Sequence, residues 1–210
     1  MKSEVCRIKA VLFDFDSTLT KPGALDFKKV KLDLGCPADV PVLEFIECIP
    51  DPVMWETARS ELDRFEAKAA ARSQPNSGAE EIVCHLRREG LFTGIITRNS
   101  RVSVERSLEN FKNTDLSDFD LVITRDDWIK PKPSHEGILM AARRLNVEPG
   151  QILVVGDFIF DIQAGNRAGA VTVLLDNGDV TDAVAAESDH TISSLHELKE
   201  VVRRETARLK

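Results

Sequence analysis

Short apolar runs alternate with helical patterns along most of this chain, and that alternation most constrains its fold. The runs are nearly continuous and rich in Val, Ile and Leu, which is typical of strands covered on both faces. Between them, apolar residues recur at helical spacing, as at Ile138, Ala142 and Leu145. The alternation predicts an α/β fold with a mainly parallel sheet. The six predicted strands are Ile8–Phe15, Leu91–Thr97, Leu121–Thr124, Gln151–Gly156, Val171–Leu175 and His190–Ser193.

Residues 21–77 interrupt the alternation, because they contain no convincing strand. Apolar residues at helical spacing predict three helices there, of which the first ends at Gly35 and the third begins at Asp51-Pro52, a favourable N-cap and first-turn pair. The Ser-Gln-Pro-Asn-Ser-Gly segment at 73–78 has the composition of a linker. We therefore predict a small all-helical domain over residues 21–77, inserted after the first strand into a core of residues 1–20 and 78–210.

Charge and cysteine content limit the partners and the compartment. The formal net charge is −7, from 28 basic and 35 acidic residues, which argues against general binding to nucleic acid or an anionic membrane. No run approaches the ~20 apolar residues that span a bilayer, and residues 1–7 contain no apolar signal region. We expect a cytoplasmic protein, either monomer or homodimer. Its four cysteines have no zinc-site spacing, so we expect buried or half-buried free thiols in a reducing compartment: Cys6, Cys36, Cys48 and Cys84.

Two carboxylates follow the first apolar run, at Asp14 and Asp16. Residues two apart on a strand point to the same side, so these two side chains can converge at the strand end. Carboxylates that are buried without a partner cost free energy. Their position at the end of a buried strand therefore indicates a metal, a proton to be transferred, or both.

Further polar residues stand where later strands end, at Thr97, Lys130, Asp157 and Asp161. Ligands of parallel sheets bind beyond the carboxyl ends of the strands, so these residues can meet Asp14 at one edge. Several carboxylates form a hard oxygen site that suits Mg²⁺, while a lysine and a hydroxyl suit a phosphoryl group. A carboxylate can also be the nucleophile of phosphoryl transfer, through an aspartyl-phosphate.

Four motifs together resemble the haloacid-dehalogenase superfamily, and within it the phosphatases similar to phosphoglycolate phosphatase. Asp14–Thr18 resembles the DxDxT motif, and Thr97 falls at the second motif. Lys130–Pro133 resembles the KPxP form of the third motif, and Gly156–Asp161, followed by Ala168-Gly169, resembles the GDxxxD motif. The resemblance implies a Rossmann-like three-layer core. It also implies that the helical insertion is a mobile cap that shields the site and selects the substrate.

The resemblance assigns roles to the four acids. Asp14 would be the nucleophile and a magnesium ligand. Asp16 would protonate the leaving oxygen and then deprotonate the attacking water, with its main-chain carbonyl on the metal. Asp157 would complete the metal site, and Asp161 would be a ligand or a support for one. From its position alone, Asp161 also reads as an N-cap of the following helix.

The same resemblance places Thr97 and Lys130 on the phosphoryl oxygens, with Thr18 nearby. The Lys-Pro-Lys-Pro sequence offers two lysines, and the alignment with KPxP favours Lys130 over Lys132. Arg98 and Asn99 follow Thr97 directly. They are candidates for holding the substrate, with surface or capping roles as the alternative.

The expected function is a magnesium-dependent phosphatase that acts on a small phosphorylated metabolite. Dehalogenases and phosphonatases of the superfamily lack the second acid of the first motif, so Asp16 argues against both. A phosphomutase similar to β-phosphoglucomutase keeps all four motifs and stays open as an alternative. A second alternative is a signalling module similar to a response-regulator receiver domain, which also gathers acids, a Thr and a Lys around a phosphorylatable Asp.

Overall fold

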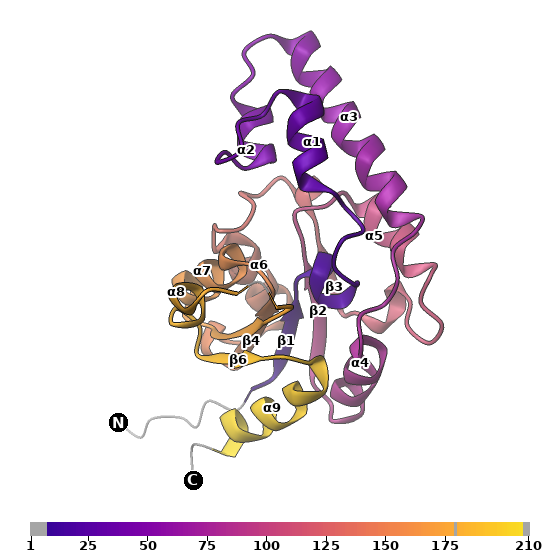
Figure 1. Ribbon diagram of the computed structural model, residues 1–210. Helices are drawn as coiled ribbons and strands as arrows, with labels where there is room; N and C mark the ends of the chain where they lie inside the picture. Colours follow the sequence, from indigo (N-terminus) through magenta and orange to yellow (C-terminus); the bar gives the residue numbers. More distant parts are fainter. Residues whose placement is uncertain (1–7, 179, 208–210) are drawn as a thin grey trace.

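A computed structural model describes residues 8–178 and 180–207 of the chain (Figure 1). Its centre is one six-stranded sheet in which every strand pairing is parallel, in the order β3-β2-β1-β4-β5-β6. Each predicted strand is present, trimmed by at most two residues at either end, and the predicted α/β fold is confirmed. The strands are β1 Ala10–Phe13, β2 Phe92–Ile96, β3 Leu121–Ile123, β4 Ile152–Gly156, β5 Val171–Leu175 and β6 His190–Ile192.

The central strand β1 is fully buried and pairs with neighbours that are distant in sequence. Ala10 lies opposite Phe92 of β2 on one side and Ile152 of β4 on the other. The side chains of β1 alternate between two apolar clusters, with Val11 in one and Leu12 in the other. Both faces of the sheet therefore need a cover, which explains why the strand is apolar at every position.

Helices cover both faces of the sheet and complete three layers. One apolar cluster contains residues of α4, α5 and α9, and the cluster on the other face contains residues of α6 and α7. The apolar stripes predicted for these segments are the sides that contact the strands. The core helices are α4 Ala79–Arg88, α5 Arg101–Leu108, α6 Glu136–Leu145, α7 Ile159–Ala168, α8 Asp182–Ala185 and α9 Leu198–Ala207.

Three helices form in the inserted segment: α1 Phe27–Leu34, α2 Val42–Glu47 and α3 Pro52–Ala70. The Asp51 side chain caps α3 by accepting from Met54 N at 2.8 Å, and Gly35 ends α1 with a φ of 66°. The three helices share an apolar cluster of their own and stand over the carboxyl ends of the strands (Figure 1). That they act as a separate cap domain stays a prediction.

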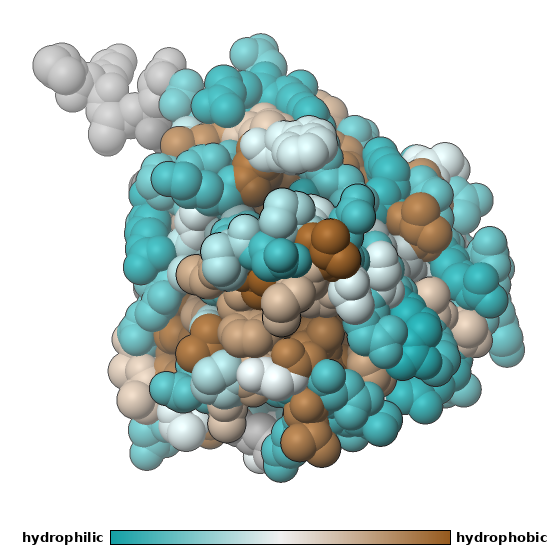
Figure 2. All heavy atoms as spheres, turned by 90° about the horizontal axis from the view of Figure 1, so that it is seen from above, coloured by the Kyte–Doolittle hydropathy of each residue, from teal (hydrophilic) through white to brown (hydrophobic). Residues whose placement is uncertain are grey.

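Figure 2 looks down on these inserted helices and shows apolar side chains among hydrophilic ones. The large exposed apolar residues of α1 and α3 are Phe27, Leu32, Val53, Met54 and Trp55. Among the described helices, none is both long enough and apolar enough to cross a membrane.

The predicted linker at 73–78 is hydrogen-bonded to residues 19–21, the first connection between the core and the inserted helices. Lys21 N donates to Gln74 O, and Asn76 N donates to Leu19 O, each at 2.8 Å. Thr20 also pairs with Pro75 in an antiparallel bridge. The two connections to the inserted helices therefore run side by side.

The three described cysteines are free thiols, as predicted, but their burial differs from the expectation. Cys36 is buried, whereas Cys48 and Cys84 are exposed. The prediction for Cys6, like that for the signal region at 1–7, falls outside the described residues.

Candidate active site

A tight turn follows β1 and sets the positions of Asp14 and Asp16. Asp14 is the first residue beyond the strand, and its N–H donates to Val155 O at 2.8 Å. The chain then makes a π-type turn over Phe15–Leu19, within which Ser17 has a φ of 60°. The expectation that both acids lie on the strand itself is thus wrong in detail, because β1 ends at Phe13. The turn, rather than strand alternation, orients their side chains.

Three carboxylates converge at the carboxyl edge of the sheet. Oxygens of Asp14, Asp157 and Asp161 all lie within 4.8 Å of one another. Asp157 follows β4 and accepts from Thr18 Oγ1 at 3.2 Å, which ties it to the turn after β1. Asp161 lies in the first turn of α7, where it accepts from Phe158 N at 3.2 Å. Asp161 therefore combines the predicted site position with a role at the helix terminus.

Gly156 makes room for this arrangement. A Cβ atom at residue 156 would lie only 2.2 Å from Cγ of Asp161. The glycine of the GDxxxD motif is therefore needed for a close approach between the strand end and the Asp161 carboxylate.

The lysine that reaches Asp14 is Lys132, and the placement predicted for Lys130 is wrong. Lys132 Nζ donates to Asp14 and, at 2.5 Å, to Asp161, and its side chain is only 5% exposed. Lys130 is exposed, and its main-chain N–H donates to Glu136 at 3.1 Å. A turn in which Ser134 N donates to Pro131 O brings the second lysine of Lys-Pro-Lys-Pro inward. The KPxP alignment favoured Lys130, and this turn explains why Lys132 faces the acids instead.

The electrostatics of the acids show an excess of negative charge. Burial, opposed by Lys132 and reinforced by the other two acids, raises the pKa of Asp14 well above its ordinary value. Burial, and after it the Asp161 carboxylate, raises the pKa of Asp157 to about 7. Burial lowers the pKa of Lys132, but Asp14 and Asp161 outweigh it and raise that pKa to about 12. One ammonium thus faces three carboxylates, and a divalent cation with a preference for oxygen ligands fits this donor set.

Asn99 holds the second acid of the first motif. Its Nδ2 donates to Asp16 Oδ2 at 2.9 Å, and its main-chain N–H donates to Thr97 Oγ1 at 3.2 Å. Burial raises the pKa of Asp16, and the hydrogen bond from Asn99 opposes that shift. The loop after β2 therefore links the buried Thr97 hydroxyl to the Asp16 carboxylate. The motif predicted Thr97 at this edge but gave no signal for the contact between Asn99 and Asp16.

Arg98 contacts the inserted helices. Its guanidinium donates to both carboxylate oxygens of Glu44 on α2, at 3.0 and 2.6 Å, and to the main-chain carbonyl of Lys132. It also lies over the ring of Phe160, 5.2 Å from the centroid. The prediction that Arg98 holds substrate stays a prediction, and sequence reasoning missed its partner Glu44.

The chain is similar to known hydrolases over most of its length. Residues 11–175 match the family described as haloacid dehalogenase-like hydrolase. An uncharacterized hydrolase of Saccharomyces cerevisiae, YOR131C, is 32% identical over 93% of this chain and 89% of its own. An N-acetylmuramic acid 6-phosphate phosphatase of Pseudomonas aeruginosa is 25% identical over 82% of this chain and 83% of its own. Among solved structures, a hydrolase from Pseudomonas syringae superposes with a TM-score of 0.77 at 20% identity, covering 92% of this chain and 99% of its own.

Proposed function

The chain belongs to the haloacid dehalogenase-like hydrolase family, and on this premise we propose that it is a magnesium-dependent phosphatase. It would hydrolyse a small phosphorylated metabolite through an aspartyl-phosphate on Asp14. The observation that carries the proposal is the convergence of three carboxylates and the Lys132 ammonium, with Asp16 two residues beyond Asp14. The phosphatase related at 25% identity supports a phosphate ester as the substrate class. We also propose a cytoplasmic location, and the acidic composition argues against a nucleic-acid or anionic-membrane partner.

The metal would be held by the carboxylates of Asp14, Asp157 and Asp161 and the main-chain carbonyl of Asp16. When bound, Mg²⁺ supplies positive charge that lowers the repulsion between the anionic nucleophile and the phosphate. The raised pKa values of Asp14 and Asp157 support this assignment, because a bound cation would stabilise the ionised form of buried carboxylates that lie close together.

In the first step, the Asp14 carboxylate attacks phosphorus, and the bond from phosphorus to the leaving oxygen breaks. Asp16 gives its proton to that oxygen, which the raised pKa of Asp16 favours. In the second step, Asp16 takes a proton from water, which attacks the phosphorus of the aspartyl-phosphate and releases inorganic phosphate. Lys132 and Thr97 would bind the phosphoryl oxygens throughout.

The nucleophile is tested by replacing Asp14→Asn and measuring release of p-nitrophenol from p-nitrophenyl phosphate with Mg²⁺. We expect turnover to fall by roughly a thousandfold or more, because the attacking anion and one metal ligand are both lost. The matched control is Asp39→Asn, which changes an exposed acid of the inserted segment and is expected to keep full activity. Undiminished turnover in Asp14→Asn would end the covalent mechanism. An aspartyl-phosphate of the unaltered protein that lasts for hours would instead favour the receiver-like signalling module.

A further inference from the structure

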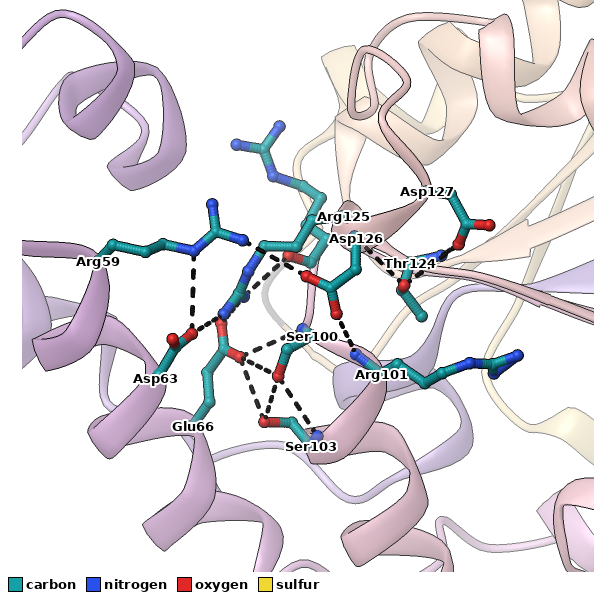
Figure 3. A network of polar contacts seen from close by, with 11 residues as sticks. Arg59, Asp63, Glu66, Ser100, Arg101, Ser103, Thr124, Arg125, Asp126 and Asp127 are labelled. Carbon is teal, nitrogen blue, oxygen red and sulfur yellow. Dashed lines mark hydrogen bonds and ion pairs between the residues drawn. The ribbon is translucent and has the colours of Figure 1, made fainter. Parts of the chain in front are cut away.

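A buried ion pair joins helix α3 of the inserted segment to the core (Figure 3). Glu66 of α3 and Arg125, which follows β3, face each other, with side chains 4% and 3% exposed. Arg125 also pairs with Asp63, one turn earlier on α3. Burying two charges is expensive, and well-packed apolar residues often replace such a pair with no loss of stability. The pair therefore calls for an explanation other than stability.

The second oxygen of Glu66 binds the loop that follows β2. Glu66 Oε2 accepts from the main-chain N–H of Ser100, from the Ser100 hydroxyl and from the Ser103 hydroxyl, each at 3.3 Å. Figure 3 shows both serines pointing toward the Glu66 carboxylate. A single side chain of α3 thus receives three hydrogen bonds from the loop and from the start of α5.

Arg125 binds the main chain of the same loop at the two preceding residues. Its guanidinium donates to Arg98 O at 3.3 Å, and its main-chain N–H donates to Asn99 O at 3.1 Å. Glu66 and Arg125 together therefore hydrogen-bond to main-chain atoms of three consecutive residues, 98 to 100. The middle residue, Asn99, is the one whose side chain holds Asp16.

We propose that Glu66 is a positioning residue that, through Ser100 and Arg125, fixes the Asn99 loop and thereby the Asp16 carboxylate for proton transfer. The inference rests on the proposed function, since it assigns Asp16 the proton that the leaving oxygen receives. Small displacements of a reacting group can reduce a rate about a hundredfold, so a loosened loop slows the steps in which Asp16 moves a proton. Transfer to Asp14 from an ester whose leaving group needs no proton is spared.

The test compares Glu66→Gln with unaltered protein on phenyl phosphate and on p-nitrophenyl phosphate, with Mg²⁺. The first turnover is followed by rapid mixing, so that phosphoryl transfer to Asp14 is separated from hydrolysis. We expect phenol release to slow at least about tenfold and the first turnover of p-nitrophenyl phosphate to change less than about threefold, because only the phenolate leaving group needs the acid. Glu61→Gln, the same change at a half-buried position of α3 away from Arg125 and Ser100, is the matched control and is expected to slow neither ester.

A double variant, Glu66→Met with Arg125→Met, guards against a trivial loss of folding. It removes the Glu66–Arg125 ion pair without leaving a lone buried charge, and thermal unfolding by circular dichroism checks that it folds. The folded double variant is expected to show the same selective loss on phenyl phosphate. Equal slowing of both esters, or no slowing of either, in the folded variants would overturn the positioning role. If the unaltered protein turned over neither ester, the proposed function itself would fall, and this inference with it.

Discussion

At the scale of single residues, the site depends on which charged groups the local turns bring together. The motifs predicted the acids correctly in position: Asp14, Asp157 and Asp161 do converge. They favoured Lys130 over Lys132, because Lys130 aligns with the first residue of KPxP, and the structure places Lys132 at Asp14 instead. The choice is made by a turn of the main chain, and a pattern of residue types holds no information on that geometry.

The two lysines form a natural pair of test variants. Lys132→Met removes the ammonium that faces Asp14 and Asp161, so we expect turnover of p-nitrophenyl phosphate to fall roughly a hundredfold or more. Lys130→Met changes an exposed side chain and is expected to keep activity within about twofold. Steady-state kinetics of the two variants decide the matter. A larger loss at residue 130 than at residue 132 would restore the alignment that the motif favoured.

At the scale of helices, strands and turns, local sequence signals were reliable where the two residues in contact lie within a few positions of each other. Asp51 caps α3 and Gly35 ends α1, each through contacts a few residues away. The contacts of Asn99 with Asp16 and of Glu66 with Ser100 join residues far apart in sequence, so the local sequence does not predict them. The same reason explains why the linker at 73–78 was predicted without its hydrogen bonds to residues 19–21.

The turn between β4 and α7 offers a test at this scale. Gly156→Ala would place a methyl group 2.2 Å from Cγ of Asp161, so we expect the carboxylate to be displaced and activity to fall about a hundredfold. Gly165→Ala is the matched control, since this position on α7, the helix that carries Asp161, would clash with Thr172 Cγ2 at 2.4 Å instead. Both variants should lower the free energy of unfolding by about 1–3 kcal/mol. Activity measured at a temperature where both stay folded should fall selectively in Gly156→Ala, and an equal loss in both would contradict this account.

At the scale of the whole molecule, the alternation of apolar runs and helical patterns was enough to predict a mainly parallel sheet with both faces covered. Each buried strand of a parallel sheet is covered on two faces, and the predicted strands are accordingly rich in apolar residues. The position of the inserted helices over the site was expected only from the family resemblance, because it depends on contacts such as those of Arg98 with Glu44. The stability of the assembled fold should in turn depend on the metal.

We expect Mg²⁺ at a hundredfold excess over Kd to stabilise the fold by about 2.7 kcal/mol, raising the midpoint of thermal unfolding by roughly 5–10 °C. Asp157 must lose its proton to bind the cation, and its pKa in the metal-free protein is about 7. Below that pH the proton competes, so affinity should fall by up to about tenfold per pH unit. Thermal unfolding with a fixed Mg²⁺ concentration should therefore show a smaller shift at pH 6 than at pH 8. Equal shifts at the two pH values, or a full shift in Asp157→Asn, would argue against Asp157 as a ligand.

The central place of β1 also sets an order on biosynthesis. The strand is made first, yet its partners begin at Phe92 and Ile152 of a 210-residue chain. A ribosome must therefore translate beyond Ile152 before β1 can acquire both neighbours. Until then its Val, Leu and Phe side chains have no complete sheet to enter, and they are what a chaperone waiting at the ribosomal exit would meet.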